Sequence, residues 1–262
     1  MSGLPAGVTE EGLRRELLET AHVLHARGWV SNHDGNASCR LGPGRLLCTP
    51  TAVSKGDVSA ESLIVVDDDN AVIQGTRRAF SELQLHRAAY AARPDIGVVL
   101  HAHPPHATAF AVSGRDLGHP FMAEPVVSLG PRIPVVPYHR PKDPALDAAI
   151  GVALAVADVA ILDRHGVLAV GGSFEQALLR LELLEHLARI AAAAAPLGGV
   201  RALPAAEVAA LSAKGRPGSK PGWGEARRGS PAVSASGQTP ARPTPARPDV
   251  AGLVDATLRR FN

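Results

Sequence analysis

The chain has 262 residues, of which 45% are hydrophobic and 20% are charged, and its formal net charge is +2. A chain of this size and composition can bury a full core, so we expect a globular protein. It contains no run of eighteen apolar residues, which excludes a transmembrane helix, and its small net charge without a basic patch argues against nucleic acid as a partner. The first residues lack a basic segment followed by an apolar one, so we expect no signal peptide and a cytoplasmic location.

The first part of the chain is predicted to form a helix and a β-hairpin. Thr9 is a suitable N-cap for the helix, because apolar residues follow it at helical spacing. Residues 36–41 and 45–48 are predicted to be the two strands of the hairpin. Cys39 and Cys48 could then face each other across the hairpin, and we expect them to be reduced in a cytoplasmic protein.

Further along, short apolar runs alternate with helical patterns, which predicts a mixed sheet with helices packed over it. Ser81 is a suitable N-cap for the helix expected over residues 82–93, and Gln84 stands where a capping box has its second residue. The other helices are expected directly after Pro105 and over residues 145–157 and 174–195, and the strands over residues 63–66, 71–74, 96–100, 133–137, 159–162 and 167–170.

The composition of the chain changes near residue 213. Residues 213–248 are rich in Gly, Pro, Ser, Ala and basic residues and have almost no apolar periodicity, so we expect a disordered linker. Residues 249–262 can form a short amphipathic helix, and the alternative is a frayed tail. The sequence therefore predicts one folded domain over residues 1–212, followed by these two segments.

Two histidines separated by one residue, His101 and His103, end an apolar run that is typical of a buried strand. Residues i and i+2 of a strand point to the same face, so both imidazoles should leave the sheet together and supply half of a metal site. His165, in a turn between two predicted strands, is a candidate third ligand. Three histidines with a carboxylate such as Glu82 would suit zinc or a similar divalent ion. Taken singly, each histidine is also compatible with a core or solvated position, as we expect for His86.

Glu82 is predicted to lie in the first turn of its helix, where the helix dipole and free N–H groups favour its anionic form. The alternative is an ordinary helix-starting acid. Residues 35–38, residues 49–51 and Ser81 carry amides and hydroxyls suited to an anion such as phosphate, although each segment could also be a simple turn.

These candidate residues belong to an ordered series of short motifs. The series is Gly35-Asn36-Ala37-Ser38, Thr49-Pro50-Thr51, Phe80-Ser81-Glu82-Leu83-Gln84-Leu85-His86, Ala92-Arg93-Pro94-Asp95, His101-Ala102-His103-Pro104-Pro105, Ile133-Pro134-Val135-Val136-Pro137-Tyr138 and His165-Gly166-Val167. In this order the motifs resemble those of the class II aldolase/adducin family, and the resemblance covers residues 11–211.

The resemblance implies an α/β fold over residues 1–212, a three-layer αβα sandwich with a central mixed or antiparallel sheet, usually assembled as a homotetramer. It implies one divalent ion per chain, zinc above all, with manganese, cobalt or iron(II) as alternatives. His101, His103 and His165 would hold the ion, and Glu82 would be the catalytic acid/base and could ligate the ion before substrate enters. The residues implied for binding the phosphate of the substrate are Asn36, Thr51 and Ser81.

Three positions depart from the family pattern. Phe80 replaces the first of two serines that commonly precede the glutamate, and Ala52 replaces a glycine that often follows the Thr-Pro-Thr segment. Phe121 stands in the stretch where the aldolase has a tyrosine that handles a substrate oxygen. The metal ligands and the base are therefore complete, whereas the recognition of the substrate is altered.

The resemblance implies a metal-dependent lyase of the aldolase type, acting in carbohydrate metabolism. Such an enzyme would cleave a C–C bond of a small phosphorylated hydroxy-ketone through an enediolate that the ion stabilises. A decarboxylase or an epimerase of the same family, acting on a keto acid, hydroxy acid or sugar phosphate, is the first alternative. A non-catalytic, adducin-like interaction protein is the second, and retention of all three histidines argues against it. The partner is a small-molecule substrate, whose identity and stereochemistry the sequence does not settle.

Overall fold

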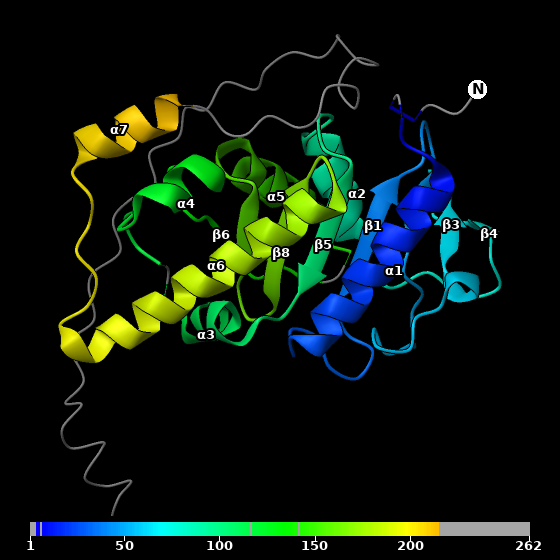
Figure 1. Ribbon diagram of the computed structural model, residues 1–262, viewed down its shortest axis with the longest axis horizontal. Helices are drawn as coiled ribbons and strands as arrows, with labels where there is room; N and C mark the ends of the chain where they lie inside the picture. The colour runs from blue at the N-terminus through cyan, green and yellow to red at the C-terminus, as the bar shows by residue number, and fades with distance from the viewer. Residues whose placement is uncertain (1–3, 6, 116, 141, 215–262) are drawn as a thin grey trace, which may run out of the picture. The chain divides into compact units, whose positions relative to one another are not determined.

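The computed structural model describes residues 4–5, 7–115, 117–140 and 142–214, and Figure 1 shows how they are arranged. The predicted linker at residues 213–248 lies outside the described residues except for its first two positions, and the predicted segment at residues 249–262 lies wholly outside them. Among the described residues no helix is long and apolar enough to cross a membrane. The helices are α1 (Glu10–Ala26), α2 (Leu83–Ala92), α3 (Pro105–Ser113), α4 (Ala123–Ser128), α5 (Pro144–Val156), α6 (Phe174–Ala194) and α7 (Ala205–Ala213), with short 3₁₀ turns η1 (Ala60–Ser62) and η2 (Ala195–Leu197).

One mixed sheet organises the described residues. Its strands are β1 (Asn36–Arg40), β2 (Leu46–Cys48), β3 (Ile64–Val66), β4 (Val72–Gln74), β5 (Val98–Ala102), β6 (Val135–Val136), β7 (Val159–Leu162) and β8 (Gly166–Gly171). Their order across the sheet is β4-β3-β2-β1-β5-β8-β7-β6. Every neighbouring pair is antiparallel except β6 and β7, which are parallel. The expectation of a mixed, largely antiparallel sheet is therefore confirmed.

Helices cover both faces of this sheet. One apolar layer joins α1, α3 and α6 to the residues of the strands that point toward them, such as Leu47 and Leu100. The other layer joins α2 and α5 to the alternate residues of the same strands, such as Leu46 and Val99. In Figure 1, α1 and α6 lie in front of the sheet. This period-2 division of the strand residues is what a sheet buried on both faces requires, and it confirms the three-layer α/β/α architecture.

The start of α2 differs from the sequence prediction. The helix begins at Leu83, so Glu82 rather than Ser81 is its N-cap residue, and Glu82 makes no side-chain capping bond. Gln84, expected in a capping box, instead donates to the carbonyl of Asp143 and to Asp147 Oδ1, and accepts from the amide of Lys142. Tertiary contacts with the start of α5 therefore replace the predicted local cap, and the capping prediction is wrong.

The two cysteines do not face each other. In the β1–β2 register, Cys39 is opposite Leu47 and Cys48 is opposite Ser38. An offset of one residue places side chains on opposite faces of a sheet, so Cys39 lies in one apolar layer and Cys48 in the other. Both are buried free thiols, and burial raises the pKa of Cys48 to about 12.

Candidate metal centre and active site

Three histidines from two adjacent strands meet at one end of the sheet. His101 lies on β5, His103 directly follows that strand, and His165 occupies the turn between β7 and β8. Antiparallel pairing of β5 with β8, in which His101 is opposite Leu168, brings the turn beside the two strand histidines. Their ligand atoms all lie within 4.8 Å of one another. The structure thus places together the three residues that the sequence selected.

The hydrogen bonds made by Nδ1 of His101 and of His103 indicate which ring nitrogen of each histidine is available to an ion. His101 Nδ1 is 2.9 Å from the carbonyl oxygen of Val167, and His103 Nδ1 is 3.0 Å from Asp34 Oδ2. Both partners only accept hydrogen bonds, so each Nδ1 carries a proton, and each Nε2 is the nitrogen that a metal ion would use. Burial lowers the pKa of His101 to about 3, which keeps this imidazole neutral.

The two Nε2 atoms of His101 and His103 are 3.2 Å apart. This spacing can be compared with that of two nitrogens that share one cation. Two nitrogens bound to one tetrahedral zinc ion at about 2.0–2.1 Å would be about 3.3 Å apart. The donor set and its spacing therefore fit a divalent ion of the zinc type.

Glu82 closes the group from the opposite side. Its Oε1 is 2.6 Å from His165 Nε2, and its Oε2 is 3.6 Å from His101 Nε2 and accepts a hydrogen bond of 2.7 Å from Asn36 Nδ2. Burial alone would raise the pKa of Glu82, but the hydrogen bond from His165 and the charges of the neighbouring histidines outweigh burial and hold the pKa well below its usual range. Glu82 is therefore an anion that contacts the candidate metal ligands and also lines a cavity.

Two glycines make this close packing achievable. Gly35 has a φ of 64°, and a Cβ there would collide with Val30 and lie 3.1 Å from the carbonyl oxygen of His101. A Cβ on Gly166 would meet the ring of His103 and lie 2.6 Å from the carbonyl oxygen of Ala102. Only glycine lets the backbone approach the histidines this closely.

The three residues that the resemblance implies for binding phosphate lie at different depths in the structure. Ser81 lines the cavity next to Glu82, whereas Asn36 is buried beneath it. The backbone amide of Thr51 donates to the carbonyl of Arg78, which ties the Thr-Pro-Thr loop to the segment that leads to Ser81. Ala52 has a φ of 57°, in the left-handed region that favours glycine.

Phe80, the other departure near the expected phosphate pocket, is not among the residues that line the cavity. It is buried in the apolar layer under α2, with its ring centroid 5.0 Å from that of His86. Its replacement of a serine therefore removes a hydroxyl without placing an aromatic ring among the residues that line the cavity.

A cavity of about 270 Å³ opens beside Glu82 and His165. Arg164, in the β7–β8 turn, contributes an exposed guanidinium whose carbon is 6.0 Å from the centroid of the Tyr138 ring. Its backbone has a φ of 57° and its amide donates to the carbonyl of Ala111. The sequence analysis did not select Arg164, although its place next to a metal ligand was a usable signal.

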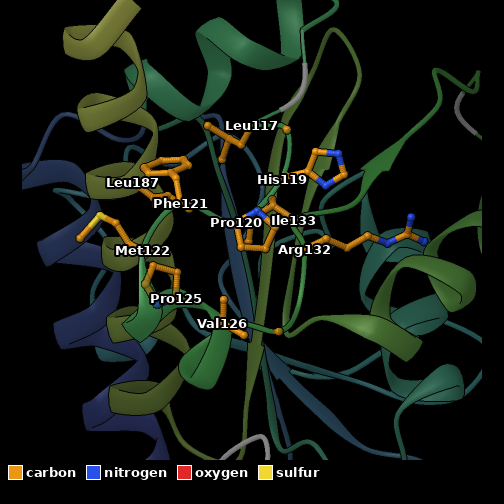
Figure 2. A pocket seen from close by; sticks show the side chains of 12 residues that line it. Leu117, His119, Pro120, Phe121, Met122, Pro125, Val126, Arg132, Ile133 and Leu187 are labelled. Atoms are coloured by element: carbon orange, nitrogen blue, oxygen red, sulfur yellow. The ribbon is translucent and has the colours of Figure 1, made fainter. Parts of the chain in front are cut away.

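A second and smaller pocket, of about 20 Å³, contains none of the residues of the histidine site. Figure 2 shows Phe121 on its wall, with the ring beside Leu187 of α6 and Leu117. Phe121 and Met122 pack against the apolar layer of α1, α3 and α6. In the stretch where the resemblance implies a tyrosine, Phe121 therefore contributes its ring to apolar packing.

Further residues support the site without having been predicted. Asp34 orients His103 and also accepts from the amide of Ser31. Lys55 is buried and donates to the carbonyls of His33 and Val53, which holds the loop that carries Asp34. His86, expected to be a core or solvated residue, is fully buried and hydrogen-bonded to Asn36.

Three histidines converge at one end of a sheet that helices cover on both faces, and a carboxylate lies beside them. This arrangement is typical of an enzyme that uses a divalent ion. Residues 15–192 match the family described as the class II aldolase and adducin N-terminal domain. The chain belongs to this family, and the three-histidine group fits the divalent metal on which class II aldolases depend.

Relatives named for different reactions have similar sequence identities to this chain. The chain is 32% identical to 3-oxo-tetronate 4-phosphate decarboxylase of Cupriavidus necator, over 70% of this chain and 84% of the relative. It is 31% identical to methylthioribulose-1-phosphate dehydratase of Gluconobacter oxydans, over 66% and 88% of the two chains. It is 30% identical to L-fuculose phosphate aldolase of Methanococcus vannielii, over 67% and 93%. Among solved structures, YgbL of Klebsiella pneumoniae superimposes with a TM-score of 0.70 and 32% identity, over 78% of this chain and all of that one.

Proposed function

We propose that this chain is a metal-dependent lyase that decarboxylates a small phosphorylated 3-oxo acid. The observation that carries the proposal is the anionic Glu82, 2.6 Å from a metal-ligand histidine on the wall of a cavity of about 270 Å³. The relative of Cupriavidus necator, a decarboxylase by name, supports this reaction over the aldol cleavage that the sequence analysis favoured. Retro-aldol cleavage is the second candidate, which the relative named L-fuculose phosphate aldolase supports.

The residues divide the chemistry between them. His101, His103 and His165 would hold a divalent ion, which supplies a Lewis acid for a carbonyl oxygen and an adjacent hydroxyl. When the bond between the hydroxyl-bearing carbon and the carboxylate breaks, its electron pair stays on that carbon and CO₂ leaves. Glu82, which is ionised at rest, would take up one proton from solvent and deliver it to this carbon as a general acid. The net reaction consumes one proton and releases one CO₂.

Decarboxylation makes fewer demands on the site than retro-aldol cleavage. In a retro-aldol reaction, a group must also take the proton of the hydroxyl that becomes the departing aldehyde. In the family aldolase a tyrosine handles this oxygen, and Phe121 stands in the corresponding stretch. CO₂ leaves without any proton transfer to oxygen, so a site with Glu82 as its one acid/base is sufficient.

We place the two anionic ends of the substrate at two different groups of residues. The exposed guanidinium of Arg164 would bind the carboxylate, because arginine matches the planar geometry of that group. Ser81 and Thr51 would bind the phosphate, as the family resemblance implied. We further propose zinc as the native ion and a homotetramer as the assembly, again on the strength of the resemblance.

The proposal is tested by supplying the purified, zinc-loaded protein with 3-oxo-tetronate 4-phosphate and, separately, with L-fuculose 1-phosphate. Release of CO₂ from the first compound, abolished by a chelator, is the expected result. Cleavage of the second compound alone would replace decarboxylation by the aldolase reaction. A protein that binds no divalent metal and acts on neither compound would refute an enzymatic function and favour the interaction protein.

A further inference from the structure

A chain of buried hydrogen bonds leads from Glu82 into the apolar layer under α2. Asn36 Nδ2 donates to Glu82 Oε2 at 2.7 Å, and Asn36 Oδ1 is 2.6 Å from His86 Nε2. His86 Nδ1 is 2.7 Å from Ser38 Oγ, which in turn is 3.0 Å from the hydroxyl of Tyr90. The four residues behind Glu82 are all buried.

The chain follows from matching steps on a helix and a strand. Glu82, His86 and Tyr90 are spaced by four residues from the N-cap of α2, so they share one face of the helix. Asn36 and Ser38 are two residues apart on β1 and share one face of the sheet. Four helical residues advance about 6 Å and two strand residues advance about 6.7 Å, so the two series stay in step.

The direction of every bond follows from the carboxylate at its end. Ionised Glu82 only accepts, so the NH₂ group of Asn36 faces it and the amide oxygen faces His86. His86 Nε2 must then carry the proton, and His86 Nδ1 must accept from the hydroxyl of Ser38. The hydroxyl of Tyr90 has one hydrogen, which it donates to the carbonyl of Ser38 at 2.9 Å or to Ser38 Oγ at 3.0 Å, and either bond holds the far end in place. A flip of the Asn36 amide would therefore break two bonds at once.

We propose that Asn36, His86 and Ser38 are positioning residues that aim the carboxylate of Glu82, with Tyr90 anchoring the far end of the chain. Both polar ends of the Asn36 side chain are engaged within the protein, so its role is exerted on Glu82 rather than on phosphate. The inference rests on the proposed function in one respect, which is that Glu82 is the catalytic acid/base. The hydrogen-bond directions themselves do not depend on which substrate is turned over.

The first test is a spectroscopic one that needs no substrate. In zinc-loaded protein labelled with ¹⁵N-histidine, the imidazole signals of His86 should show a single neutral tautomer with the proton on Nε2. The Ser38→Ala variant should shift the Nδ1 signal of His86, because Nδ1 loses its donor. A proton on Nδ1 in the wild type would reverse every bond in the chain and would overturn the proposal.

The second test measures turnover of 3-oxo-tetronate 4-phosphate along the chain. Asn36→Leu and His86→Leu should each lower kcat by about 10- to 100-fold, the usual cost of losing a residue that orients a catalytic group, with little change in KM. His86→Gln should recover most of the lost turnover, because its amide can make both bonds. The loss in kcat should be smaller for Ser38→Ala than for the two leucine variants, and smallest for Tyr90→Phe.

The matched control is Ser113→Ala, which removes a serine hydroxyl that donates to the carbonyl of Phe110 at the end of α3. It should leave turnover unchanged. Melting temperature and zinc content are measured for every variant. If the losses in kcat follow the melting temperatures rather than the order of the residues in the chain, these residues are structural only and the proposal fails. If Glu82→Gln retains full activity, the proposed function fails, whatever the tautomer of His86.

Discussion

The substitution Glu82→Gln tests the centre of the proposed mechanism with little change of shape. In the wild type, Glu82 Oε2 accepts from Asn36, and Oε1 contacts His165 Nε2. Because His86 fixes the orientation of Asn36, the oxygen of the new amide must face Asn36 and its NH₂ group must face His165. The substitution therefore keeps the bond from Asn36 and removes the negative charge, but it places an NH₂ group where His165 Nε2 had an acceptor.

The expected result is a folded, largely metal-loaded variant that has lost its proton transfer. Loss of a general acid/base lowers turnover by at least about 10²-fold, which corresponds to roughly 2.7 kcal/mol of activation free energy. The melting temperature should fall only modestly, since a hydrogen bond to a charged group contributes about 1.5–3 kcal/mol and the new amide keeps a neutral bond in its place. CO₂ release, zinc content and a melting curve are measured together.

Glu175→Gln is the matched control, because Glu175 also lies in the first turn of a helix, α6, and is exposed. It should behave as the wild type in all three measurements. Near-normal turnover of Glu82→Gln would mean that another group moves the proton, and the assignment of Glu82 as acid/base would be refuted. Loss of zinc together with turnover would show that Glu82 acts chiefly as a metal ligand.

Three further predictions follow from the same geometry. Wild-type protein should carry close to one divalent ion per chain, and His103→Ala should lose most of it. Asp34→Ala should weaken the metal affinity by about 10- to 100-fold, because His103 loses its acceptor. Metal titration checks both expectations, and a fully active metal-free wild type would refute the site. Arg164→Gln should raise KM for a carboxylate substrate at least about tenfold, given 1.5–3 kcal/mol for a charged hydrogen bond, whereas the exposed Arg201→Gln should not. Metal-free protein should lose stability as the pH falls from about 6.5 toward 3: burial lowers the pKa of His86 to about 3, so below the ordinary value of 6.5 the unfolded chain binds a proton that the folded chain does not. The difference in unfolding free energy between the wild type and His86→Gln should therefore change by about 1.4 kcal/mol per pH unit in that window. Urea denaturation of both proteins at pH 6.5 and at pH 5 measures this difference. The same difference at both pH values would contradict the prediction.

The metal ligands and most elements were predictable because their signals are local. The pair His101 and His103 follows from period-2 geometry at the end of a strand, and α1 and α6 follow from long apolar periodicity that starts at an N-cap. The helices α4 and α7 were not predicted, since α4 is short and α7 contains no buried residue among those described, so neither has a clear apolar stripe.

The supporting residues were not predictable because their partners are distant in the sequence. Asp34 meets His103 across 69 positions, and Asn36 meets His86 across 50. Gln84 looked like a local cap and bonded instead to residues about 60 positions away. A local pattern can place such a side chain on a helix face, but only the packing of β1 against α2 decides which group it meets.

The order of the strands gives the metal centre a second consequence, for the folding of the protein. Strands β1–β5 form one contiguous part of the sheet and β6–β8 the other, and in the part of the chain that the structure describes the two join through the pairing of β5 with β8. His101 and His103 belong to the first part and His165 to the second, so one bound ion would cross-link the two across a loop of about 60 residues. A cross-link over a loop this long removes substantial freedom from the unfolded chain. Amide hydrogen exchange in β5 and β8 should therefore slow together when the ion binds, because opening this junction would first require releasing the metal.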